Sequence, residues 1–157
     1  MILALLCVAA GFSSPIGGLK ASATRSAQLT AAAEQLLKVE KEIAASNEGA
    51  EFLLYGDVLA LLDEAVSEDA TNVHARALSG EVLLLQSEND DGTYDVCSLV
   101  EAREDADFVL KHNGGAADAT IARQVIKAIQ AIPPDEIPDD PATCEGEKRH
   151  GSQARSS

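Results

Sequence analysis

The feature that most constrains this chain is an apolar periodicity that runs through five successive segments. In each segment apolar residues recur at three- and four-residue steps, which places them on one face of an α-helix. Polar breakers separate the segments, and Pro133 with Pro134 ends the last one. The pattern predicts helices over about residues 21–46, 51–68, 73–86, 96–112 and 116–131.

Residue types at the predicted helix ends agree with these ranges. Thr71 or Asn72 can cap the third helix, because both side chains accept hydrogen bonds from a first-turn amide. Lys111 and His112 precede two glycines, as is typical of a helix carboxyl end. In the first helix the apolar face consists of Leu29, Ala33, Leu36, Leu37, Ile43 and Ala44, with Lys38, Glu40, Lys41 and Glu42 mainly on the opposite side.

The small share of aromatic residues favours the same fold class. Aromatics make up 3% of the chain and Trp is absent, so the core must consist mainly of Ala, Leu, Val and Ile. Alanine favours helices most, whereas β-sandwiches and barrels are normally richer in aromatics and Thr. We therefore expect an all-α protein of antiparallel helical hairpins.

An excess of acidic residues limits the classes of partner. Twelve basic and 26 acidic residues give a formal net charge of −14. Such a surface repels phosphate backbones and anionic membranes, so nucleic acid is not an expected partner. Basic peptides, basic protein surfaces and cations fit this charge better, although acidity that serves solubility alone is equally compatible.

The first twelve residues, from Met1 to Phe12, are almost all apolar. This length suits the hydrophobic part of a secretory signal and is too short to span a bilayer as a helix. Small residues allow cleavage after Ala10 or Ala23, so residues 1–23 are interpreted as a leader that contacts a membrane only transiently. A buried first helix, or a fragment of a longer chain, is the alternative. The leader predicts a secretory-pathway or extracellular protein; without it, a cytoplasmic one.

The remaining chain divides into a helical domain, 24–132, and a polar tail, 133–157, which is rich in Pro, Ser and charge and is predicted to be disordered. Of the cysteines, Cys97 and Cys144 either pair in an oxidising compartment or remain two free thiols. Neither Cys97 nor Cys144 lies in a spacing typical of a zinc site.

Small residues between Val58 and Leu110 recur where closely crossing helices need them. They are Ala65, then Ala75, Ala77 and Gly80, then Ala102 and Ala106. This region resembles the tetratricopeptide (TPR) repeat family, although Arg76 replaces the aromatic of that motif. The step from Val58 to Ala102 is 44 residues against a usual repeat of about 34, and the surplus falls in an acidic loop.

The resemblance implies a short TPR-like solenoid of stacked hairpins in which the fifth helix is a C-terminal capping helix. It also implies a non-enzymatic protein-protein interaction module, of the adaptor or co-chaperone type, that binds a peptide or helix in a groove lined by first helices. On the third helix this points to His74, Arg76, Glu81 and Gln86 as groove residues.

One acidic loop partly matches a calcium-binding loop. Asn89, Asp91 and Asp95 stand at oxygen-ligand positions, but Ser87 and Ser98 replace the opening Asp and the closing Glu, so strong calcium binding is not expected. Nucleophile elbows, phosphate loops and helical His pairs are absent from the sequence, and we expect no enzymatic activity, cofactor or dedicated metal. Two alternatives to the interaction module are an exported or lumenal structural helical protein and a weak cation-binding acidic protein.

Overall fold

A computed structural model describes residues 16–46, 55–89, 91–137 and 144. The regular structure of these residues is helical, which confirms the all-α prediction, and an isolated bridge between Glu88 and Tyr94 is their one β-type pairing. The elements are α1 (Ile16–Ser46), α2 (Tyr55–Glu68), α3 (Val73–Gln86), α4 (Val96–Lys111), α5 (Ala116–Ala131) and the short 3-10 helix η2 (Pro134–Glu136).

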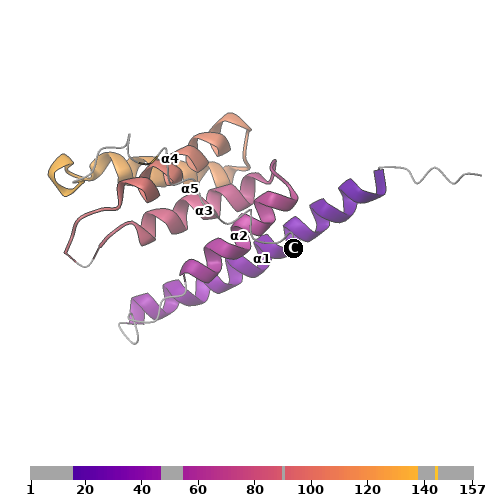
Figure 1. Ribbon diagram of the computed structural model, residues 1–157, viewed down its shortest axis with the longest axis horizontal. Helices are drawn as coiled ribbons and strands as arrows, with labels where there is room; N and C mark the ends of the chain where they lie inside the picture. Colours follow the sequence, from indigo (N-terminus) through magenta and orange to yellow (C-terminus); the bar gives the residue numbers. More distant parts are fainter. Residues whose placement is uncertain (1–15, 47–54, 90, 138–143, 145–157) are drawn as a thin grey trace, which may run out of the picture.

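The helices pack as two hairpins and a fifth helix. Helix α1 packs along α2 and α3 along α4, while α5 lies against both α3 and α4 (Figure 1). Helix α2 also contacts α3, so α3 joins the first hairpin to the second. The first turns of α1 extend beyond the rest of the bundle (Figure 1).

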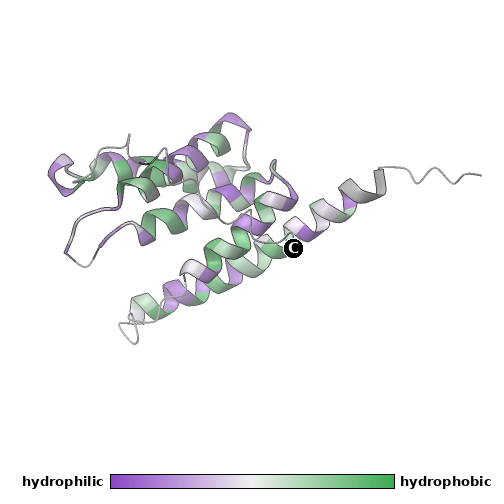
Figure 2. Ribbon diagram, viewed as in Figure 1, coloured by the Kyte–Doolittle hydropathy of each residue, from purple (hydrophilic) through white to green (hydrophobic). Residues whose placement is uncertain are grey.

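Two groups of buried apolar side chains form the core, and α3 contributes to both. One lies between α1, α2 and α3 and includes Leu37, Leu62 and Val82; the other lies between α3, α4 and α5 and includes Val109 and Val125. Hydrophobic and hydrophilic residues alternate along the described helices (Figure 2). Burial of the two apolar groups is the main driving force for the fold.

Helix α1 buries a stripe that is partly polar. The Ser26 hydroxyl donates to the Ala65 carbonyl of α2 at 2.7 Å, and the Thr30 hydroxyl donates to the Ser26 carbonyl. Glu40 is 2% exposed, which corrects the expectation that it belongs to the polar side of this helix. Apolar periodicity alone does not identify these positions, because Ser26 and Thr30 are buried through hydrogen bonds.

The observed helix bounds agree closely with the predicted ones where both are described. Helices α3 and α5 match exactly, and Asn72 caps α3 by accepting a hydrogen bond from the Ala75 amide. Helix α4 ends at Lys111, one residue before the predicted end, and α1 begins at Ile16 rather than at about 21. The predicted start of the second helix lies outside the described residues.

The turn after α4 uses Asn113 and Gly114 differently from the predicted glycine stop. Asn113 takes the left-handed conformation, with φ of 53°, and the Gly114 amide donates to the Val109 carbonyl, as in a Schellman motif. Gly114 is needed for space, since a Cβ there would lie 2.8 Å from Cγ1 of Val73.

Parts of the predicted leader and tail lie within the described residues. Residues 16–23 form the first turns of α1, and the Ser22 hydroxyl donates to the Glu68 carbonyl at the end of α2. In the tail, η2 is fixed to the fold by the Tyr94 amide, which donates to the Glu136 carbonyl at 2.9 Å. The two candidate cleavage positions differ in their effect on this contact, because a cut after Ala23 removes Ser22 and a cut after Ala10 keeps it. Residues 1–15 of the leader and residues 138–143 and 145–157 of the tail lie outside the described part.

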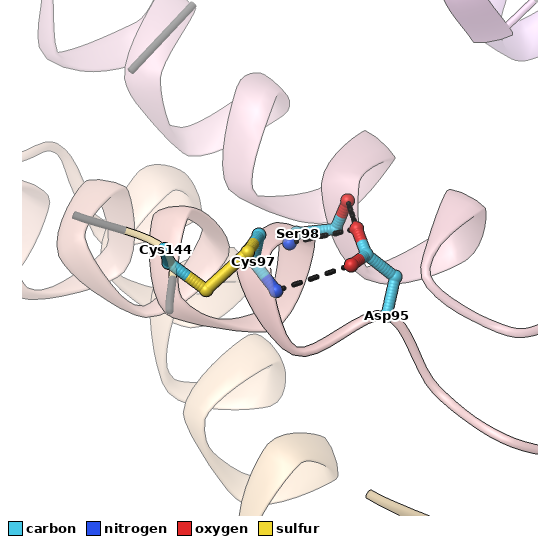
Figure 3. The surroundings of a disulfide bond; sticks show 4 residues. All are labelled: Asp95, Cys97, Ser98 and Cys144. Carbon is cyan, nitrogen blue, oxygen red and sulfur yellow. Dashed lines mark hydrogen bonds between the residues drawn. A yellow bond between two sulfur atoms is a disulfide. The ribbon is translucent and has the colours of Figure 1, made fainter. Parts of the chain in front are cut away.

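A disulfide joins Cys97, in the first turn of α4, to Cys144 (Figure 3). Their Cα atoms are 5.3 Å apart, within the range that an unstrained bridge requires. Between the two alternatives for these cysteines, the structure has the paired form. None of the described helices is long and apolar enough to cross a membrane.

Candidate functional site

A groove of about 680 Å³ opens between α1, α3 and α5. Helix α1 forms most of its wall, while α3 and α5 complete it. Its apolar lining consists of the exposed Ala31 and Ala45 of α1, the half-buried Ile121 of α5, and the largely buried Leu37 of α1 and Leu78 of α3 at its floor. An apolar surface of this kind, open on one side, fits the apolar face of another helix or peptide.

Five charged side chains also line this groove, and four of them form two ion pairs. Lys41 of α1 contacts Glu81 of α3, with 2.6 Å between Nζ and Oε1. Lys38 and Glu42 face each other along α1 at 4.0 Å. The fifth, Glu34, has its carboxylate 3.6 Å from Nε2 of His74 on α3. Histidine is charged only when protonated, so this last contact is an ion pair only when His74 carries its second proton.

His74 is held in place by α5. Its Nδ1 lies 2.8 Å from Oδ1 of Asp118, whose side chain is 16% exposed. Because a carboxylate can only accept, this hydrogen bond assigns the proton of the neutral ring to Nδ1. Nε2 of the neutral ring then carries no hydrogen, and only protonation of His74 makes Nε2 a possible donor to the Glu34 carboxylate 3.6 Å away.

The two contacts between α1 and α3 have the same spacing in both helices. Glu34 and Lys41 are seven residues apart on α1, and His74 and Glu81 are seven residues apart on α3. Seven residues are about two helical turns, or about 10.5 Å. The groove therefore has two charged contacts between α1 and α3, and the one that involves His74 is an ion pair only when His74 is protonated.

Tyr55, at the start of α2, lies near the same charges. Burial, followed by the negative charges of Glu40 and Glu81, raises the pKa of the Tyr55 hydroxyl above its usual value of 10.0. Tyr55 is therefore a neutral hydroxyl throughout the physiological range and adds no charge to this end of α1.

The structure separates the four predicted groove residues. Glu81 lines the groove, and His74 contacts the groove residue Glu34. Arg76 instead faces α4, with Nη1 2.6 Å from Oδ1 of Asp105 and its guanidinium 4.6 Å from the centre of the Phe108 ring. Gln86 is exposed at the end of α3 and is not among the lining residues.

Sequence reasoning missed the wall that α1 contributes. The signal for it is the set of charged residues Glu34, Lys38, Lys41 and Glu42, of which the last three lie four, seven and eight residues after the first, and such a set is equally typical of a solvated helix face. Only the position of α3 beside this face distinguishes the two readings.

The three calcium-loop candidates are engaged in local hydrogen bonds. Oδ1 of Asp91 accepts from the hydroxyl and the amide of Thr93, which lowers the pKa of this carboxyl. The Asn89 side-chain amide donates to the Thr93 hydroxyl at 3.0 Å. These bonds close the loop, in which Gly92 takes a left-handed φ of 81°.

Asp95 uses both carboxylate oxygens to cap α4. Oδ1 accepts from the Cys97 amide, while Oδ2 accepts from the amide and the hydroxyl of Ser98 (Figure 3). Burial raises the pKa of Asp95, but the hydrogen bonds from Ser98 and Cys97 outweigh it and the net pKa is lowered. Across the described part of the chain, no three His, Cys, Asp or Glu side chains are grouped so that they could hold a metal ion.

Comparison with known proteins yields no match: no family model fits the chain, and no curated protein and no solved structure is significantly similar to it.

Proposed function

We propose that this protein is a non-enzymatic interaction module, of the adaptor or co-chaperone type, whose groove between α1, α3 and α5 binds an amphipathic helix or peptide. The partner has an apolar face and basic residues along its edge. The observation that carries the proposal is the groove itself, where Ala31 and Ala45 of α1 and Ile121 of α5 are accessible above a floor of Leu37 and Leu78, which are 2% and 4% exposed.

Charge supports a basic partner. The whole chain has a formal net charge of −14, which accelerates the approach of a basic peptide at low ionic strength. Within the groove three carboxylates stand against two lysines. The lysines pair with Glu81 and Glu42, which leaves Glu34 for a cation of the partner.

The order of the helices supports a TPR-like solenoid as the framework. The groove-lining helices are the first helix of each hairpin and α5, the helices that face the ligand in that repeat family. In this proposal α5 is the capping helix, and the acidic loop between α3 and α4 contains the residues by which the repeat exceeds its usual length.

A panel of designed peptides tests the proposal. Each fluorescein-labelled peptide has about 14 residues and leucines at i, i+3, i+4 and i+7, with lysines, glutamines or glutamates along the edge. We expect the lysine peptides to raise fluorescence anisotropy and to shift the NMR methyl signals of Leu37, Leu78 and Ile121. Failure of every peptide to bind and to shift these signals at millimolar concentration contradicts the proposed function.

Two neighbouring alanines of α1 provide a matched pair of variants. Ala31 lines the groove, whereas Ala32 is also exposed but is not a lining residue. Ala31→Trp fills the groove and is expected to abolish peptide binding, while Ala32→Trp is expected to leave it unchanged. Equal binding by the two variants contradicts the groove as the binding site.

The disulfide favours a second candidate function, that of an exported or lumenal structural protein. Disulfides such as Cys97–Cys144 persist in oxidising compartments and are rare in the cytosol. Intact-mass and amino-terminal analysis of the protein from its host tests this candidate. A chain cleaved after Ala10 or Ala23, with an intact bridge and no peptide binding, favours it over the interaction module.

A further inference from the structure

We infer that Glu34 recognises a lysine or arginine of the bound partner at neutral pH and that His74, once protonated, competes for the same carboxylate. This inference rests on the proposed function, since it names the charge that the groove selects. It adds that recognition is weaker in acid, through a contact between α1 and α3 that forms only when His74 is charged.

When His74 is neutral, the Glu34 carboxylate lies near a ring nitrogen, Nε2, that carries a lone pair and no hydrogen. Because Nδ1 of His74 donates to Asp118, the unprotonated Nε2 has no hydrogen to offer the Glu34 carboxylate 3.6 Å away. Two acceptors at this distance do not attract each other, so the carboxylate turns to a better cation when one is presented. The Glu34 side chain is 59% exposed, so a partner residue can reach it.

Protonation of His74 gives the Glu34 carboxylate a cation within the protein. Protonated His74 carries a positive charge, donates from both nitrogens and contacts one carboxylate at each of them, Asp118 from α5 and Glu34 from α1. These are the charged groups that contact His74 in the described part of the chain. Glu34 then has a cation within the protein itself, and the partner's lysine must compete with it.

The other charges of the groove do not explain such a switch. Lys41 forms an ion pair with Glu81 and Lys38 with Glu42, and neither pair includes a histidine. Among the contacts of the described groove region, the one between His74 and Glu34 is an ion pair only when its histidine is protonated.

The test compares two otherwise identical peptides from the panel, one with lysine and one with glutamine at the edge position that contacts Glu34. Affinity for wild type is measured at pH 7.5 and 5.5. We expect the lysine peptide to bind about two- to fivefold more tightly than the glutamine peptide at pH 7.5, the size of a single exposed ion pair. At pH 5.5 this advantage is expected to disappear.

Three variants test which side chains cause the preference for lysine and its loss in acid. Glu34→Gln is expected to remove the lysine preference at both pH values, while Glu104→Gln, an exposed change on α4 with the same loss of charge, is expected to keep it. His74→Gln, which does not gain a charge in acid, is expected to keep the preference at pH 5.5. Circular dichroism melting of each variant at both pH values verifies that the fold is intact.

The outcomes separate the inference from the proposed function. Peptides that bind wild type and Glu34→Gln with the same lysine preference overturn the inference and leave the proposed function standing. A loss of preference in acid that persists in His74→Gln overturns the role of His74. Absence of binding by every peptide overturns the proposed function, and the inference with it.

Discussion

Gly80 of α3 lies directly against the backbone of Ala102 in α4. A Cβ built on Gly80 would be 3.1 Å from the Ala102 carbonyl oxygen and 3.5 Å from Cβ of Asp105. The two helices of the second hairpin therefore approach each other closely at a position where a larger side chain would meet the backbone of α4.

Gly80→Ala is expected to destabilise the protein. The added methyl meets a carbonyl of the helix backbone, which cannot move aside as a flexible side chain can, and the cost of about 1–2 kcal/mol exceeds the gain in helix propensity. Urea unfolding measures the change. Gly56→Ala is the control: Gly56 is exposed on α2 with nothing within 4 Å of its Cβ position, so the same substitution is expected to stabilise by about 0.5 kcal/mol. Equal effects at both positions contradict the close crossing.

Asn72→Asp is expected to destabilise although it keeps a good capping residue. The Asn72 oxygen caps α3, while its side-chain amide donates to the hydroxyls of Ser26 and Thr30 at 2.8 and 2.9 Å. Both hydroxyl protons are already donated to backbone carbonyls, so an aspartate oxygen there would face two acceptors. We expect a loss of about 1–3 kcal/mol in the free energy of unfolding at pH 7. A variant as stable as wild type would show that capping is the main role of Asn72.

This same network explains what the sequence can and cannot predict. The ends of α3 and α5 are encoded locally, by Asn72 as a cap and by Pro133 and Pro134 as a stop, so their bounds follow from neighbouring residues alone. The buried positions Ser26 and Thr30 on α1 depend on Ala65 and Asn72, which lie about 40 residues further along the chain. The apolar periodicity of α1 does not depend on these distant residues, so it cannot predict that Ser26 and Thr30 are buried.

In the candidate site, too, some positions follow from local sequence and others depend on the packing of distant segments. Glu81 was predicted as a groove residue because it lies on a helix expected to face a ligand, and it does line the groove. Arg76 lies on the same helix, but the nearby Asp105 and Phe108 of α4 draw its side chain to another face. Predicting that choice requires the packing of α4 against α3, which the sequence of either helix does not specify.

Asp95 is expected to make the stability of α4 depend on pH. Its pKa is lower in the folded protein than the usual 3.8, so its contribution is complete above pH 3.8 and is lost as pH falls through the lower, folded pKa. Asp95→Asn keeps a capping side chain without this titration and is expected to lose less stability than wild type between pH 5 and 2. Asp95→Ala is expected to lose about 1 kcal/mol already at pH 7. Urea unfolding at several pH values compares the three proteins, and parallel profiles for wild type and Asp95→Asn contradict the prediction.

Removal of the disulfide is expected to lower stability by about 2–4 kcal/mol, because the Cys97–Cys144 bridge restricts the unfolded chain over a separation of 47 residues. The thermal midpoint of wild type should fall on addition of a reductant, whereas that of the double variant Cys97→Ser/Cys144→Ser should not change. Peptide mapping without reduction checks that the two cysteines are linked to each other. A wild-type midpoint that reductant does not move contradicts this role.

Arg76 is expected to matter for stability and not for binding. It neutralises Asp105, whose side chain is 11% exposed, so Arg76→Ala leaves a largely buried carboxylate without its ion-pair partner and is expected to cost about 2–3 kcal/mol. The double variant Arg76→Ala/Asp105→Ala should be less destabilised than the sum of the single changes, because both members of the pair are absent. Arg76 does not line the groove, so at temperatures where Arg76→Ala is folded, it should bind the lysine peptide as wild type does. Additive unfolding free energies would contradict the stabilising pair of Arg76 with Asp105. A loss of peptide affinity in the folded Arg76→Ala variant would instead support the groove role that the sequence suggests for Arg76.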